Sequence, residues 1–178
     1  MHDPAIVALG ANLPGRSGSP ERAVREAMQR LSALSVVAPR CSSLWRSRPV
    51  DCPPGSPDFI NAVVALQPAE GTTPLELLGQ LQQLEQAFGR QHGGGRNAPR
   101  VLDLDLIAWG ARCSETAQLE LPHPRAHDRA FVLMPFAEVA PDLVFPGQKE
   151  SVRTLAATCS GKKEVFRCQG IAGGRWVC

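Results

Sequence analysis

The sequence predicts an α+β fold, in which helices pack on a mainly antiparallel sheet. The first observation is the order of the segments, which reads strand, helix, strand, strand, helix, strand. The second is that both helices of this series begin with clear capping residues. This β-α-β-β-α-β order is typical of a ferredoxin-like α/β sandwich.

The first strand and the first helix lie in the N-terminal part of the chain. Residues 5–9 (AIVAL) form a short apolar run that Gly10 ends, which predicts a buried strand followed by a tight turn. Ser19 then supplies an N-cap, and Pro20 suits the first helical position. Apolar residues recur at helical spacing from there to about residue 34.

Two further strands are predicted before the second helix. Residues 36–45 are strand-like, although Pro39 indicates an edge position or a bulge. Residues 46–57 hold four prolines and predict a loop. The segment FINAVVAL, residues 59–66, is a strong strand candidate because it is rich in β-branched and apolar residues.

The remaining elements follow in a clear order. Residues 73–76 (TPLE) form a capping box with proline at the first helical position, and Gly89 ends the helix. Next come a strand over 101–109, a short strand near 118–121 and a helix over roughly 130–138.

The chain divides into a main domain over residues 1–147 and an appendix over residues 148–178. The appendix carries glycine, lysine, arginine and three cysteines with weak periodicity, so its structure is left open.

Composition excludes several classes of protein. With 19 Lys+Arg against 17 Asp+Glu, the net charge of +2 argues against a protein devoted to non-specific nucleic-acid binding. No apolar run approaches the length of a membrane span, and no signal peptide is apparent, so we expect a cytoplasmic protein. The six cysteines lack metal-ligand spacing; three disulfides are compatible with the count, but we expect reduced thiols.

Two aspartates on the strand 101–109 are the strongest candidates for chemistry. Alternate strand residues share a face, so Asp103 and Asp105 lie together, roughly 6–7 Å apart along the strand. Such a pair suits a hard divalent cation such as Mg²⁺, which prefers oxygen ligands. A solvent-facing edge strand, or neutralisation by arginines, would also explain the pair. The apolar residues expected on the opposite face are Leu102, Leu104, Leu106 and Ala108.

Basic residues flank this pair on both sides. Arginines in a glycine-rich loop next to a metal site suit phosphoryl transfer, although a solvated surface loop is the commoner explanation. His123 and His127 could face phosphates at a helix start or bind zinc, but a third zinc ligand is not obvious. Neither nucleotide-binding glycine fingerprint is present. The upstream basic residues are Arg90, His92, Arg96 and Arg100, and the downstream ones include Arg125 and Arg129.

These motifs together resemble a known family, the 6-hydroxymethyl-7,8-dihydropterin pyrophosphokinases of folate biosynthesis. The resemblance implies the same α+β sandwich and transfer of pyrophosphate from ATP to the pterin hydroxyl, which releases AMP. The matching segments are ALGANL (8–13), SSLWRSRPV (42–50), DFINAVVAL (58–66), LEQAFGR (84–90), PRVLDLDLIAWG (99–110) and LPHPRAHDRAFVLMPFAEVAP (121–141).

The resemblance also implies roles for individual residues. Asp103 and Asp105 would hold two Mg²⁺ ions, and arginines would help catalysis by contacting phosphates. The loops at 10–18, 46–57 and 89–99 would close over the site. The residues implied in phosphate contact are Arg90, Arg100, His123 and Arg129. Gln82 and Glu85 would contact the nucleotide, but their shared helix face could equally be a plain helix edge.

The pterin would lie between Phe59 and Phe131, with its edge bonded to Asn61. Aromatic residues are scarce here, with six Phe, three Trp and no Tyr, although simple core packing would also explain both phenylalanines. Ser47 to Val50 would add backbone contacts. The sequence departs from some relatives at His92, Asn97 and Pro124, which affects the expected ATP contacts.

Two other functions fit the residues without the resemblance. One is a metal-dependent phosphodiesterase or nuclease that uses the two aspartates, and the other is a non-catalytic ferredoxin-like binding module. For the pyrophosphokinase we expect a monomer whose partners are ATP and the pterin, without nucleic acid or membrane.

Overall fold

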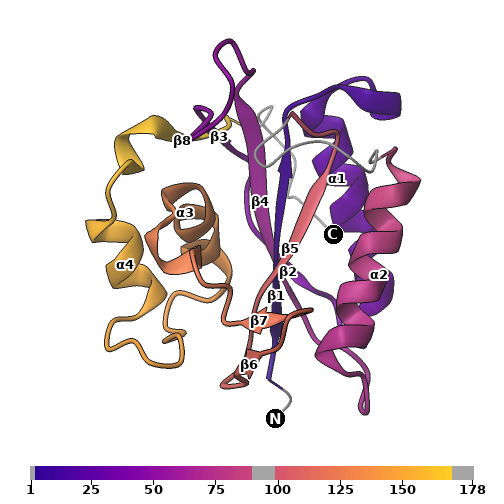
Figure 1. Ribbon diagram of the computed structural model, residues 1–178, viewed down its shortest axis with the longest axis vertical. Coiled ribbons are helices and arrows are strands. Elements are labelled where there is room, and N and C mark those ends of the chain that lie inside the picture. The colour runs from indigo at the N-terminus through magenta and orange to yellow at the C-terminus, as the bar shows by residue number, and fades with distance from the viewer. Residues whose placement is uncertain (1–2, 90–98, 170–178) are drawn as a thin grey trace.

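The protein forms three layers, with one sheet between two pairs of helices (Figure 1). The computed structural model describes residues 3–89 and 99–169. Helices α1 (Pro20–Leu31) and α2 (Pro74–Ala87) cover one face of the sheet. Helices α3 (Ala130–Val139) and α4 (Val152–Thr158) cover the other face. Short 3-10 turns lie at Gly15–Ser17, Ser32–Leu34, Ala126–Asp128 and Lys162–Glu164.

The sheet confirms the α+β prediction. Its path is β5-β1-β4-β3-β8, β2 also pairs with β4, and every pairing is antiparallel. The predicted first strand therefore lies between the third and the fourth, as in a ferredoxin-like sheet. The strands are β1 (Ala5–Ala11), β2 (Arg40–Cys41), β3 (Trp45–Ser47), β4 (Phe59–Leu66), β5 (Asp103–Trp109) and β8 (Val165–Arg167), with a separate hairpin of β6 (Ser114–Glu115) and β7 (Glu120–Leu121).

The helix starts are the features that the sequence predicts best. The Ser19 side chain accepts a hydrogen bond from the Arg22 amide at the start of α1. At the start of α2, the Thr73 hydroxyl accepts from the Glu76 amide, and the Glu76 carboxylate accepts from the Thr73 amide. These bonds satisfy backbone N–H groups that have no partner within the helix.

The two faces of the sheet bury two apolar clusters. Val7, Leu9 and Val64 pack toward α1 and α2, whereas Ile6 and Val63 pack toward α3 and α4. Because Leu104 belongs to the α1/α2 cluster and β5 alternates, its neighbours Asp103 and Asp105 point to the α3 face.

Ala108 does not follow this alternation, and its predicted face was wrong. The pairing of β1 with β5 shifts between Ile6 and Val7, so that Ile6 pairs with Ala108 but Val7 pairs with Leu106. The extra residue, Ile107, is a bulge that turns Ala108 toward the α3 side.

The segment predicted as one strand over 36–45 forms two short strands instead. Only Arg40–Cys41 and Trp45–Ser47 pair in the sheet, so β3 also enters the predicted loop 46–57. Pro39 has no N–H to donate to a neighbouring strand, which explains why pairing begins after it.

The C-terminal segment packs on the rest of the protein. Helix α4 lies against α3, and β8 extends the sheet by pairing with β3. The Cys168 amide donates to the Leu44 carbonyl, and the Arg167 guanidinium donates to the Ser43 hydroxyl. Within the described residues, the predicted appendix thus contributes a helix and a strand to the fold.

Removing this segment should destabilise the protein. A chain ending at residue 150 loses the buried side chains of Val152 and Val165, which are 0% and 7% exposed. At about 1.5–3 kcal/mol for each buried aliphatic side chain, we expect a loss of roughly 3 kcal/mol or more in the free energy of unfolding. A chain ending at residue 169 serves as the comparison in thermal denaturation. Equal melting temperatures would contradict the structural role of the segment.

Most of the described cysteines are free thiols. Cys52, Cys113, Cys159 and Cys168 are free, as expected. Cys41 is disulfide-bonded, so the expectation was wrong there, because sequence spacing gives no sign of which thiols meet in space.

Among the residues that the structure describes, no helix is long and apolar enough to cross a membrane.

Candidate active site

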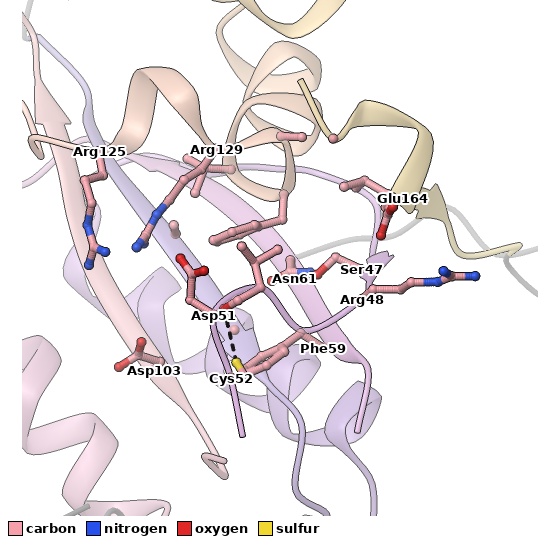
Figure 2. A pocket seen from close by; sticks show the side chains of 18 of the residues that line it. Ser47, Arg48, Asp51, Cys52, Phe59, Asn61, Asp103, Arg125, Arg129 and Glu164 are labelled. Atoms are coloured by element: carbon pink, nitrogen blue, oxygen red, sulfur yellow. Dashed lines mark hydrogen bonds between the residues drawn. The ribbon is translucent and has the colours of Figure 1, made fainter. Parts of the chain in front are cut away.

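A cavity of about 430 Å³ opens on the α3 face of the sheet, near the start of α3 (Figure 2). Its walls come from β1, β3, β4, β5, the turn before α3 and the segment between α4 and β8. The predicted site residues that line it are Ser47, Val50, Phe59, Asn61, Arg100, Asp103, Asp105, Arg129 and Phe131.

One side of the cavity, its aromatic side, holds Phe59 next to the buried amide of Asn61. Asn61 Nδ2 donates to Ser47 Oγ at 2.9 Å and to the Trp45 carbonyl at 3.4 Å. Both Asn61 and Ser47 are 4% exposed. Because these bonds use the amide nitrogen, Asn61 Oδ1 is left as the acceptor on this side of the cavity.

Gly10 lines this side of the cavity next to Asn61 and Phe59. A Cβ atom at Gly10 would lie 3.7 Å from Asn61 Oδ1 and 4.0 Å from the Phe59 ring. These are ordinary van der Waals distances, and the backbone of Gly10 is ordinary strand.

The other side of the cavity carries the two aspartates. Asp103 and Asp105 line the cavity from β5, and Arg100 Nη1 lies 2.6 Å from Asp103 Oδ1. This contact is short enough to be a charge-assisted hydrogen bond. It is the neutralisation by arginine that the sequence leaves open as an alternative explanation of the acid pair, with the Arg100 side chain 27% exposed.

Asn12, which is 3% exposed, holds the backbone of Arg100 in place. The backbone N–H of Asn12 donates to the Arg100 carbonyl at 2.9 Å, and the backbone N–H of Arg100 donates to the side-chain oxygen Oδ1 of Asn12 at 2.7 Å. Asn12 Nδ2 also donates to the Pro57 carbonyl at 3.3 Å. One side chain thus ties the end of β1 to both Arg100 and the loop before β4.

Two arginines approach the aspartates from the start of α3. Figure 2 shows the side chains of Arg125 and Arg129 pointing toward the part of the cavity that holds Asp51 and Asp103. The pKa of Arg129 is lowered, mainly by burial and then by the positive charge of Arg125. The negative charges of Asp105 and Asp103 oppose this lowering in part. The Arg129 guanidinium also lies over the Phe131 ring, 5.4 Å from its centre.

His123 lies close to this charged group without lining the cavity. Its amide donates to the Ile107 carbonyl, and its Nδ1 accepts from the Arg125 amide at 3.2 Å. Burial first, and then the positive charges of Arg129 and Arg125, lower the pKa of His123 below its usual 6.5. The described residues contain no group of three His, Cys, Asp or Glu side chains that could hold a metal, so His123 and His127 form no zinc site there.

The lowered pKa of His123 predicts a stability that depends on pH. The unfolded chain has the usual His pKa of 6.5, and the folded chain has a lower one. At pH values between these two, the unfolded chain binds the proton more readily than the folded chain. Folding stability that is present above pH 6.5 is therefore lost as the pH falls toward the folded-state pKa. We expect the melting temperature to fall less between pH 7.5 and pH 5.5 in His123→Asn than in the wild type. His127→Asn is the control, and equal slopes in His123→Asn and the wild type would contradict this assignment.

Among the described residues, Gln82 and Glu85 join His123 as predicted site residues that do not line the cavity. Gln82 is exposed on α2, whereas Glu85 is buried and accepts a hydrogen bond from the Leu104 amide. Arg90 lies outside the described residues, as do His92 and Asn97.

The structure also adds cavity residues that sequence reasoning did not assign. Arg125 and Asp128 line the cavity, and their signal was present in the charged block that precedes α3. Asp51, at a positive φ of 53°, lines it from the loop after β3. Ser160, Gly161, Glu164 and Val165 complete the wall from the C-terminal segment, which carries no recognisable pattern.

Comparisons with known proteins agree with the resemblance. A family model described as 7,8-dihydro-6-hydroxymethylpterin-pyrophosphokinase matches residues 6–141. The 2-amino-4-hydroxy-6-hydroxymethyldihydropteridine pyrophosphokinase of Synechocystis sp. is 40% identical over 151 residues, which cover 85% of this chain and 73% of that protein. The enzyme of the same name from Pseudomonas aeruginosa is 38% identical, with coverage of 85% and 89%.

Solved structures agree on the fold. A Plasmodium falciparum HPPK-DHPS triple mutant with pteroate superposes with a TM-score of 0.65 at 11% identity and covers 94% of this chain. This chain spans about half of that longer one, 47%, so the likeness concerns the fold alone. Because the family model matches most of its length and the curated relatives match it closely, the chain belongs to the 7,8-dihydro-6-hydroxymethylpterin-pyrophosphokinase family.

Proposed function

We propose that this cavity is where the chain transfers pyrophosphate from ATP to 6-hydroxymethyl-7,8-dihydropterin, in folate biosynthesis. Family membership supports the reaction. The observation that supports this location is that one cavity holds an aromatic side, the pair of carboxylates on β5 and several arginines. A planar pterin suits the first of these features, and a triphosphate with its cation suits the other two.

The aromatic side is the proposed pterin site. The ring of Phe59, on this side, and that of Phe131, which also lines the cavity, would stack on the pterin. Asn61 Oδ1 would accept from a pterin N–H, since the amide nitrogen of Asn61 already donates within the protein. Ser47 and Val50 border the same side and would limit how the ring slides.

The charged side is the proposed site for the polyphosphate. Asp103 and Asp105 offer carboxylate oxygens from one strand face, which fits Mg²⁺, and we propose that they hold two such ions with ATP. Bound there, Mg²⁺ would offset phosphate charge. Arg100 and Arg129 would contact phosphate oxygens from either side, as charge-assisted donors.

The proposed step is an in-line displacement at phosphorus. The pterin hydroxymethyl oxygen forms a bond to the β-phosphorus, the bond from that phosphorus to the oxygen of the α-phosphate breaks, and AMP leaves. The hydroxyl proton passes to solvent. The protein contributes orientation and electrostatic stabilisation, and no covalent enzyme intermediate is needed. Action as a monomer in the cytoplasm, without nucleic acid or membrane, stays a prediction.

A direct assay tests this function. The protein is incubated with ATP, Mg²⁺ and 6-hydroxymethyl-7,8-dihydropterin, and AMP is measured over time. We expect AMP to form only when pterin and Mg²⁺ are both present, together with one pterin diphosphate for each AMP. AMP formation at the same rate without pterin would indicate a hydrolase instead.

A further inference from the structure

Glu85 is a buried carboxylate that lies outside the cavity. It belongs to α2, its residue is 2% exposed, and Glu85 Oε1 accepts a hydrogen bond from the Leu104 amide at 2.8 Å. Burying a carboxylate is costly unless it is well bonded. Helix packing alone would not require a carboxylate at this buried position of α2, so Glu85 calls for another explanation.

The bond is formed at the free side of an edge strand. Among the described strands, β5 ends the sheet path and pairs with β1 alone. The Leu104 amide donates to Glu85, which gives this outward N–H a partner that no strand supplies. Helix α2, which packs beside β5, brings the acceptor to this edge.

Leu104 is the one residue between Asp103 and Asp105. Its amide belongs to the peptide group that also contains the Asp103 carbonyl, so the bond to Glu85 fixes the plane of that peptide. This peptide joins the Cα atoms of Asp103 and Leu104, so its plane directly restrains the direction of the Asp103 Cα–Cβ bond. The Asp105 carboxylate is restrained less directly, through the next peptide of the same strand.

We propose that Glu85 is a positioning residue for Asp103 and Asp105, and that it acts through the Leu104 amide. The inference rests on the proposed function only in taking the carboxylate pair as the cation site. It differs from a nucleotide contact, because it predicts an effect on binding of a polyphosphate that carries no nucleoside. Inorganic tripolyphosphate with Mg²⁺ is such a probe.

The experiment compares Glu85→Ala with Glu85→Gln by calorimetric titration of Mg²⁺-tripolyphosphate into the pterin-free protein. The amide oxygen of the introduced glutamine can still accept from the Leu104 amide, whereas alanine leaves that donor unsatisfied. We expect binding about tenfold weaker in Glu85→Ala, in line with the ~10–100-fold cost of losing groups that orient metal ligands. In Glu85→Gln we expect binding within about twofold of wild type, since the accepting oxygen is retained.

Two controls separate positioning from other effects. Gln83→Ala changes an exposed side chain on the same helix and should leave tripolyphosphate binding unchanged. Pterin binding, followed by fluorescence, should stay the same in Glu85→Ala, because the proposed pterin contacts Ser47, Phe59, Asn61 and Phe131 come from β3, β4 and α3 and not from β5.

Specific outcomes would overturn the proposal. It fails if Glu85→Ala binds tripolyphosphate like wild type and loses only ATP affinity, which would indicate a contact to the nucleoside. It also fails if Glu85→Gln is as weak as Glu85→Ala. If Glu85→Ala does not fold, amide exchange in the wild type decides: rapid exchange at Leu104 would exclude the bond. The titration is informative even if AMP never forms in the assay of function.

Discussion

Replacing Asp105 with alanine should reduce AMP formation by roughly 10³-fold or more, on the scale of losing a group that stabilises the transition state electrostatically. Asp105 lines the cavity from β5, and its negative charge partly opposes the lowering of the Arg129 pKa by burial and by Arg125. Removing it takes away a proposed cation ligand and leaves the arginine charges less balanced. The measurement is the rate of AMP formation at saturating ATP and pterin, titrated with Mg²⁺.

The fold should survive this change, because Asp105 is partly exposed and lies outside both apolar clusters. Asp142→Ala is the matched control, since its carboxylate is 86% exposed and pairs only with Arg153 among the contacts of the described residues. We expect that control to keep full activity. Wild-type activity in Asp105→Ala would remove the basis for the cation site, whereas a large fall in melting temperature would make Asp105 a structural residue.

Replacing Arg100 with alanine should lower kcat by about 10²–10³-fold, which corresponds to roughly 2.7–4 kcal/mol of transition-state stabilisation. The Arg100 guanidinium lies 2.6 Å from Asp103 and the residue lines the cavity, so it can contact both the carboxylate and a bound phosphate. The backbone bonds between Arg100 and Asn12 do not involve the guanidinium. The loop should therefore keep its place in the variant. The measurement is kcat at saturating substrates.

A lysine substitution refines this prediction. Arg100→Lys keeps the positive charge but loses the forked donor geometry, so we expect partial recovery only. Arg153→Ala, at an exposed ion pair outside the cavity, is the control for loss of an arginine. An unchanged rate in Arg100→Ala would mean that its contact with Asp103 is incidental to catalysis.

The fold could be predicted where local signals were strong. The apolar run of residues 59–66 gave its strand with both ends correct, and the capping box at Thr73 placed the start of α2. The bulge at Ile107 could not be predicted, because it depends on how β5 pairs with β1 and not on its own pattern. The three-residue strand β8 is likewise too short to show a periodicity.

The sequence predicted which residue types form the site better than it predicted which distant residues meet there. Alternation alone placed Asp103 and Asp105 on one face, and the structure bears this out. Periodicity could not show that Phe59 and Phe131 share a cavity, since they come from a strand and a helix far apart in sequence; the family resemblance supplied that expectation. Glu85 shows the limit of such reasoning, because its partner is a backbone amide, which every residue but proline carries.

The pairing of β3 with β8 has a consequence for synthesis of the protein. The cavity takes its walls from residues as early as Ala8 and as late as Val165. A chain emerging from the ribosome therefore has no complete site until its last described strand has been made and has closed this long-range contact. Contacts between such distant segments form slowly and late. We expect fragments that lack β8 to be poor at binding ligands, so that catalytic competence marks a fully folded chain.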